Sequence, residues 1–167
     1  MSHPATTSAI TTTCIKTAKS YAGCGTVAAI SSHMPSFTLI DLPKIVDPRG
    51  NLTVAEQLKN VPFDIARVYW TYDVPSGERR GGHAHRTCQE IIIAVSGSFT
   101  VEVFDGKDSQ AFHLNHPYQG LYVGTGVWRT LEDFSSGAVC LVLASELFDE
   151  DEYIYDYDEF LQLISNV

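Results

Sequence analysis

The sequence predicts an all-β fold, a sandwich or barrel, followed by one short C-terminal helix. Short apolar or alternating runs rich in β-branched and aromatic residues recur at even intervals from Phe37 onward. Glycine-containing turn sequences separate these runs, and apolar residues at helical spacing occur only near the end, in 157–165. Many short strands with glycine turns and few helices are typical of β-sandwiches and β-barrels.

Successive apolar runs and turn sequences define the predicted strands in order. Residues 37–42 and 44–47 alternate or run apolar and end at an Asp-Pro-Arg-Gly turn, 47–50. The clearest stretch is 90–114, which contains a strand, a Ser-Gly turn, a second strand, an Asp-Gly turn and a third strand. Further strands are expected in four segments, the second of them as one long strand: 51–57, 61–74, 120–134 and 138–145.

The composition predicts one globular domain. The chain has 167 residues, of which 44% are hydrophobic and 19% charged. Its net charge of −9 argues against a broad nucleic-acid-binding surface. No apolar run approaches the roughly 20 residues that a membrane span needs. Cys88 and Cys140 lie in apolar runs, so we expect buried thiols in a cytoplasmic, reducing location.

The two ends of the chain differ in composition from its centre. Residues 1–34 are predicted to be a disordered or weakly ordered extension, because the first 33 hold twelve Ser or Thr and no regular hydrophobic period. The domain is therefore expected at 35–167. Residues 149–159 hold seven acidic residues and no basic one, which favours a solvated segment, although its alternating tyrosines leave open a packed strand edge.

One constellation of residues points to chemistry. Gly77 is followed after five residues by His83-Ala-His85, then after four residues by Glu90, and after six more by Gly97. This spacing resembles the first motif of the cupin superfamily, whose fold is a jelly-roll β-barrel. Because alternate residues of a strand face the same side, both imidazoles are expected to project into the barrel together.

The position of a further metal ligand is altered in this sequence. In metal-binding cupins, the two histidines and the glutamate are joined by a histidine that follows a Pro-x-Gly turn. Here Gly124-Thr-Gly126 stands at that turn and Arg129 at the histidine position. A guanidinium has no lone pair for a metal and repels a cation, so we expect no metal and no other cofactor. Glu90 leaves a metal site open as the alternative.

Two inward histidines beside arginines suit metal-free proton transfer. An imidazole titrates near neutral pH and moves protons well there. Arg79, Arg80 and Arg86 flank His83 and His85 and suit an anionic substrate. Together these groups fit proton transfer next to a carbonyl, whereas the structural alternative is a hydrogen-bonded buried pair.

The sequence resembles the dTDP-4-keto-6-deoxyglucose 3,4-ketoisomerases, the WxcM-like sugar-nucleotide isomerases of the cupin superfamily. The resemblance implies an enzyme, an isomerase that moves a keto group from C4 to C3 of a dTDP-linked 4-keto-6-deoxyhexose in deoxyamino sugar biosynthesis. It also implies a homodimer of jelly rolls with exchanged strands and no metal. The stretches that carry it cover nearly all of 37–160: DPRGNL (47–52), VPFDIARVYW (61–70), RGGHAH (80–85), GLYVGTGVW (120–128), FSSGAVCLVLAS (134–145) and FDEDEYIYDYDEF (148–160).

The resemblance makes His83 and His85 the catalytic pair. One would shuttle the proton and the other would orient or polarise the carbonyl, and the sequence does not assign these roles. Tyr72, just before the histidine turn, is a further acid or base candidate, with a packed strand tyrosine as the alternative.

The expected substrate-binding residues are mostly cationic. Arg49, Arg67 and Arg80 match family positions and are candidates for holding the diphosphate. Trp128 is a candidate lining aromatic, with core packing as the alternative. Arg129, at the altered ligand position, is expected to meet sugar or phosphate oxygens.

Three other functions remain as alternatives at this point. They are a metal-dependent cupin enzyme, a non-catalytic sugar-binding cupin, and a 3,5-epimerase acting on the same sugar nucleotide. The stereochemistry at C4 of the product is left open, and the choice of thymidine as the nucleoside follows from the resemblance alone.

Overall fold

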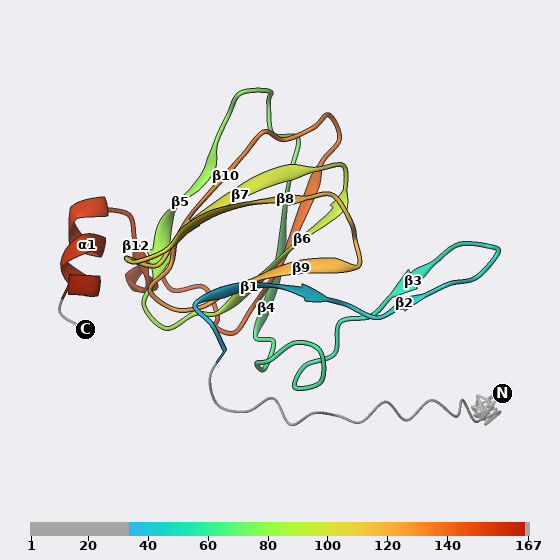
Figure 1. The fold of residues 1–167 in the computed structure, drawn as a ribbon, viewed down its shortest axis with the longest axis horizontal. Helices are drawn as coiled ribbons and strands as arrows, with labels where there is room; N and C mark the ends of the chain where they lie inside the picture. Colours follow the sequence, from blue (N-terminus) through green and yellow to red (C-terminus); the bar gives the residue numbers. More distant parts are fainter. Residues whose placement is uncertain (1–33, 166–167) are drawn as a thin grey trace, which may run out of the picture.

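Two antiparallel sheets enclose the interior of the protein in a computed structural model that describes residues 34–165 (Figure 1). The extension predicted for residues 1–34 lies almost wholly outside the described residues. The first sheet contains five strands in this spatial order: β1 (Phe37–Asp41), β9 (Gln119–Val123), β6 (Glu90–Ser96), β11 (Val139–Ala144) and β4 (Arg67–Tyr72). The second contains β12 (Tyr153–Ile154), β5 (Arg80–His85), β10 (Trp128–Glu132), β7 (Phe99–Phe104) and β8 (Ser109–Leu114). The predicted all-β, cupin-type architecture is confirmed.

The main core lies between the two sheets and follows strand alternation. Along β7, Phe99, Val101 and Val103 are buried while the residues between them are more exposed. They pack with residues of the first sheet, among them Ile92 and Cys140. Burying each large apolar side chain contributes about 1.5–3 kcal/mol. The predicted buried thiols are confirmed, and burial raises the pKa of Cys140 to about 12.

The segment predicted as one long strand, 61–74, is a strand only over its second half, β4. Residues 61–66 instead cross the outer face of the first sheet, where Val61 and Phe63 are buried against Ile91 and Ile93 of β6. Pro62 has no backbone N–H for a ladder, and burial on the sheet outweighs the local strand preference.

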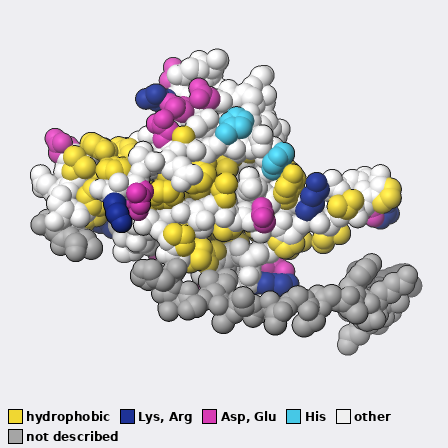
Figure 2. Space-filling view, viewed as in Figure 1, with side chains coloured by type: hydrophobic (Ala, Val, Ile, Leu, Met, Phe, Trp, Pro, Cys, Tyr) yellow, Lys and Arg dark blue, Asp and Glu magenta, His cyan; other side chains and the backbone are white. Residues whose placement is uncertain are grey.

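A small hairpin projects from the body of the protein. It consists of β2 (Lys44–Ile45) and β3 (Leu52–Thr53), joined through the predicted Asp-Pro-Arg-Gly turn. In Figure 1 it extends well away from the two sheets, and hydrophobic side chains lie along it in Figure 2. Ile45, Val46 and Leu52 are exposed there.

The acidic C-terminal region is anchored to the second sheet. A 3₁₀ turn, η1 (Glu150–Glu152), leads into β12, which pairs with β5, and the chain ends in the predicted helix α1 (Tyr157–Ser165). Phe160 of this helix is fully buried against Ala84 and Ile154. The acidic side chains are mostly exposed, as expected of a solvated segment, but the backbone between them forms a sheet edge. Within residues 34–165, the helices are too short and polar to cross a membrane.

Candidate active site

Strand β5 carries both histidines of the motif into the barrel. The rings of His83 and His85 lie 5.2 Å apart between centroids, so the prediction that alternate residues project together is confirmed. The strand enters through Gly81, whose φ is +78°. A Cβ at Gly81 would lie 2.9 Å from the carbonyl oxygen of Arg129, so β5 and β10 approach closely only because this residue is glycine.

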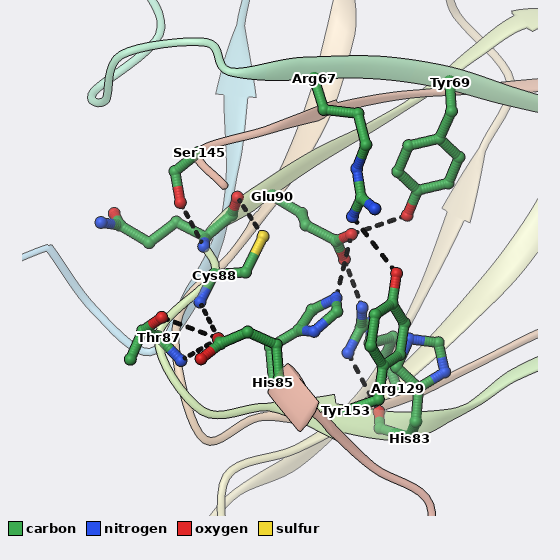
Figure 3. Close-up of polar contacts among 12 residues, drawn as sticks. Arg67, Tyr69, His83, His85, Thr87, Cys88, Glu90, Arg129, Ser145 and Tyr153 are labelled. Carbon is green, nitrogen blue, oxygen red and sulfur yellow. Dashed lines mark hydrogen bonds and ion pairs between the residues drawn. The ribbon is translucent and has the colours of Figure 1, made fainter. Parts of the chain in front are cut away.

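A buried ionic cluster lies beside the histidines (Figure 3). Nη2 of Arg129 donates to Oε2 of Glu90 at 2.6 Å, and both side chains are almost completely buried. The hydroxyl of Tyr69 donates to the other carboxylate oxygen at 2.7 Å, and Nε2 of His85 lies 3.3 Å from that same oxygen. Nη1 of Arg129 also donates to the carbonyl oxygen of His83 at 3.1 Å. These contacts link β4, β5, β6 and β10.

The charge states of this cluster follow from its contacts. Burial acts to raise the pKa of Glu90, but the charge of Arg129 and the hydrogen bonds from His85 and Tyr69 outweigh it and hold the pKa far below its usual value. Burial and the neighbouring Glu90 charge raise the pKa of Tyr69 well above its usual value. At neutral pH, Glu90 is therefore anionic and Tyr69 is a protonated hydroxyl.

His83 differs from His85 in its surroundings. Neither ring nitrogen of His83 has a hydrogen-bond partner among the described residues, whereas His85 contacts Glu90 through Nε2. Burial, together with the charges of Arg129 and His85, lowers the pKa of His83 to about 3. The imidazole of His83 is therefore neutral at pH 7, with nitrogens available to a ligand.

Two tyrosines of the C-terminal segment complete the wall. The ring of Tyr153 lies 4.4 Å from that of His85 and 4.8 Å from that of His83, between centroids. Tyr155 stacks on Tyr153 with an interplanar angle of 12°. The hydroxyl of Tyr153 accepts a hydrogen bond from Arg67 at 3.2 Å. Segments distant in sequence therefore meet at the histidine pair.

These groups line a cavity of about 490 Å³, a size usual for small-molecule sites. Its lining includes apolar side chains such as Ile92 and Val142, together with Thr71. The polar and aromatic lining residues are Tyr69, Arg79, Arg80, His83, Glu90, Arg129, Tyr153 and Tyr155.

The predicted site residues fall into two groups. His83, Arg80 and Arg129 line the cavity, with His85 packed beside His83 and Glu90. Arg67 lies behind Tyr153, bonded to its hydroxyl.

The other predicted residues lie away from the cavity. Trp128 packs on Tyr157 and Phe160 of α1, at centroid distances of 5.0 and 5.5 Å. Tyr72 is 60% exposed on the opposite face of β4. Arg49 lies at the turn of the projecting hairpin, paired with Asp47 at 2.9 Å.

Strand parity explains why Tyr69 was not predicted. Along β4, Arg67, Tyr69 and Thr71 face inward, while the residues between them are exposed. Counting alternate positions from an inward residue would have selected Tyr69 rather than Tyr72. Tyr153 gave a weaker signal, because only its pairing with β5 brings it to the histidines.

One set of described residues could hold a metal ion. Ligand atoms of His85, Cys88 and Glu90 all lie within 4.8 Å of one another. However, the carboxylate of Glu90 already accepts from Arg129 and Tyr69, and the guanidinium charge beside it opposes a cation. Burial also raises the pKa of the Cys88 thiol. The donor set therefore fits a metal poorly.

The fold and the cavity define a class of protein. A jelly roll whose cavity is lined by a neutral imidazole, a protonated tyrosine hydroxyl and arginines is suited to acid–base chemistry on a small molecule. The protein therefore has a cupin-type fold with a candidate acid–base site. More particularly, the family model described as "FdtA: WxcM-like, C-terminal" matches residues 35–165, and the chain belongs to this family.

Relatives with known names agree with this assignment. The TDP-4-oxo-6-deoxy-alpha-D-glucose-3,4-oxoisomerase of Aneurinibacillus thermoaerophilus is 43% identical over 129 residues, which are 77% of this chain and 93% of the relative. A variant of the 3,4-ketoisomerase QdtA from Thermoanaerobacterium thermosaccharolyticum, solved with TDP-4-keto-6-deoxyglucose, is 36% identical with a TM-score of 0.77, covering 80% of this chain and 97% of that one. The TDP-quinovose 3,4-ketoisomerase WlaRB of Campylobacter jejuni is 42% identical with a TM-score of 0.74, covering 77% and 99%.

Proposed function

We propose that this protein converts TDP-4-keto-6-deoxyglucose into the corresponding 3-keto sugar by metal-free proton transfer, as a step toward deoxyamino sugars. The observation that carries the proposal is His83, a neutral imidazole with free nitrogens on the wall of the cavity. The substrates named for the relatives fit this chemistry, because a 4-keto sugar carries an acidic C–H at C3 beside its carbonyl.

The reaction needs a base, an acid and no change in oxidation level overall. The C4 carbonyl acidifies the proton on C3, and removing that proton gives an enediolate across C3 and C4. Returning a proton to C4, and moving the hydroxyl proton from O3 to O4, completes the exchange of ketone and alcohol. Acid–base groups held near the operating pH serve both transfers.

We assign the proton transfer at carbon to His83. It lines the cavity and is neutral at pH 7, so it can accept the C3 proton, and the resulting imidazolium can deliver a proton to C4. Bound diphosphate would raise its proton affinity, since a nearby negative charge favours the imidazolium. His85, held by Glu90, is assigned the role of orienting and polarising the substrate oxygens. Tyr69 is a protonated hydroxyl donor on the same wall.

Binding of the diphosphate is assigned to the arginines at the cavity mouth. Arg80 lines the cavity from the start of β5, and its neighbour Arg79 is 69% exposed in its pair with Glu132. Guanidinium groups recognise phosphate oxygens through paired N–H donors. Arg129 is engaged with Glu90 and the His83 carbonyl, so its contribution to sugar binding is the positive charge it presents at the cavity wall.

We also propose a homodimer with exchanged strands in the cytoplasm. Two exposed apolar features support a second copy as the partner: the outer face of β4, where Val68 and Trp70 are 47% and 58% exposed, and the projecting hairpin. An exchanged hairpin would carry Arg49 toward the partner's cavity, which accounts for its match to family positions. Light scattering of the wild type should give twice the mass of one chain, and Trp70→Lys should lower the measured mass toward that of one chain. A monomeric wild type would overturn the proposed homodimer.

The experiment that tests the function is conversion of TDP-4-keto-6-deoxyglucose by protein treated with a chelator, followed by proton NMR. The proposal expects a 3-keto product, and its C4 coupling constants give the stereochemistry. His83→Asn should abolish conversion, whereas His113→Asn, the same change at an exposed position of strand β8, should not.

Other outcomes identify the other functions. Exchange at C5 without migration of the ketone would indicate an epimerase. Activity that returns only with added iron or manganese would indicate a metal-dependent cupin. Tight binding without turnover would indicate a sugar-binding module.

A further inference from the structure

The carboxylate of Glu152 joins the C-terminal segment to the histidine motif. Its Oε2 accepts three hydrogen bonds, from the Thr87 amide at 2.8 Å, the Thr87 hydroxyl at 2.7 Å and the Cys88 amide at 3.2 Å. The amide of Arg86 donates to the Glu152 carbonyl oxygen at 3.0 Å. Residues 86–89 form the loop that connects β5 to β6.

This loop separates two residues of the site. His85 ends β5 immediately before it, and Glu90 begins β6 immediately after it. A side chain that fixes the backbone at Thr87 and Cys88 therefore holds the C-terminal segment against the end of β5, where Tyr153 pairs with His85.

The same residue also sets the position of a wall aromatic. Tyr153 follows Glu152 directly and pairs with His85 across β12 and β5. Its ring contacts both imidazoles, and its hydroxyl accepts from Arg67. The hydrogen bond from the Thr87 hydroxyl and those from the two amides lower the pKa of Glu152, so the carboxylate is charged and a strong acceptor at neutral pH.

We propose that Glu152 is a positioning residue for the ketoisomerase reaction, which holds Tyr153 against the rings of His83 and His85 by fixing the loop 86–89. The expected effect on kcat rests on the proposed function. It adds to that function a residue of the acidic C-terminal segment that touches neither the cavity nor the substrate.

The kinetic test compares Glu152→Ala, Tyr153→Leu and the double variant. Small displacements of catalytic groups cost up to about 100-fold in rate, so we expect Glu152→Ala to lower kcat about 10- to 100-fold with less than about a threefold change in KM. Because the residue acts through Tyr153, the double variant should be no slower than Tyr153→Leu. Glu152→Gln keeps an acceptor oxygen and should recover much of the activity.

Glu150→Ala is the matched control, since Glu150 is an exposed acid of the same 3₁₀ turn. It should behave as wild type. A Glu152→Ala enzyme as active as this control, a loss confined to KM, or losses that multiply in the double variant would overturn the inference.

A measurement without substrate separates this inference from the proposed function. The rings of His83 and His85 lie 4.8 and 4.4 Å from the Tyr153 ring between centroids, so the NMR shifts of their ring protons are sensitive to its ring current. The dispersion of the amide NMR signals first shows that the Glu152→Ala and Glu152→Gln proteins are folded. In these variants the histidine shifts should move toward those of Tyr153→Leu, and the movement should be larger in Glu152→Ala. Unmoved histidine shifts would overturn the inference even if the wild type proves to be a ketoisomerase, and moved shifts would support the positioning even if it does not.

Discussion

Removing Arg129 should destabilise the protein far more than removing an exposed arginine in an ion pair of similar length. Arg129 and Glu90 are 3% and 2% exposed at their side chains and 2.6 Å apart. Losing one partner of a buried pair typically costs about 3–5 kcal/mol, because the other charge remains buried without its counter-ion. Glu90 would keep the hydrogen bond from Tyr69, so we expect Arg129→Met to cost about 3 kcal/mol. For a domain of this size, that corresponds to a fall in Tm of roughly 10–15 °C.

The control is Arg79→Met, at an ion pair of nearly equal length. Arg79 and Glu132 are 2.7 Å apart, but the Arg79 side chain is 69% exposed. Exposed pairs contribute about 0–1 kcal/mol, so this variant should lose less than about 1 kcal/mol. Equal costs for the two variants would show that burial does not determine the strength of the Arg129 pair.

The assay is equilibrium urea unfolding at pH 7, analysed as a double-mutant cycle. Arg129→Met combined with Glu90→Gln removes both charges, and the neutral amide can still bond Tyr69. The double variant should therefore be more stable than Arg129→Met alone, with a coupling of at least about 1.5 kcal/mol. A double variant whose loss of unfolding free energy equals the sum of the two single losses would refute a tightly coupled buried pair. A loss below about 1 kcal/mol for Arg129→Met would refute it as well.

Three further predictions concern the same region. The pKa of His83 is lowered to about 3, so below pH 6.5 its imidazole is protonated in the unfolded chain but not in the folded protein. The free energy of unfolding therefore falls as pH falls from 6.5 toward 3. Measured at pH 7, 6 and 5, it should fall more steeply for wild type than for His83→Asn, by at most about 1.4 kcal/mol per pH unit. Tyr69→Phe deprives Glu90 of a donor and should lower the unfolding free energy by about 1.5–3 kcal/mol in urea, and an unchanged value would contradict the 2.7 Å bond. Gly81→Ala should lower both Tm and kcat, because the alanine Cβ would meet the Arg129 carbonyl oxygen. Gly82→Ala has a similar φ but open space around the Cβ, so it should lower the free energy of unfolding only by the backbone strain, about 1 kcal/mol.

Local sequence patterns predicted those parts of the fold that depend on neighbours in the chain. The strands from 90 to 114 are specified by period-two alternation and tight glycine turns, and they occur as β6, β7 and β8. Residues 61–66 also have strand-forming composition, but burial of Val61 and Phe63 on the outer face of a sheet decides their conformation. That contact lies between segments about thirty residues apart and leaves no mark in the local pattern.

The candidate site was predictable to a similar extent. His83 and His85 are two residues apart on one strand, so local geometry places both in the interior. The sequence left the role of Glu90 open, because its partner Arg129 is thirty-nine residues away. Tyr153 lies in an acidic segment whose composition indicates solvent exposure, and only the pairing of β12 with β5 brings it to the histidines.

The most direct test of the central claim is turnover of TDP-4-keto-6-deoxyglucose in D₂O, with the isotope at C4 of the product read by NMR and mass spectrometry. Proton transfer through His83 predicts deuterium at C4 in the turnovers in which the imidazolium exchanges with solvent before it delivers its proton, and it predicts no 3-keto product when His83→Asn is used. A His83→Asn enzyme that forms the 3-keto product at the rate of the wild type, with or without deuterium at C4, would show that His83 does not carry the proton between the carbons. That result would contradict the assignment of His83 as the proton-transfer group.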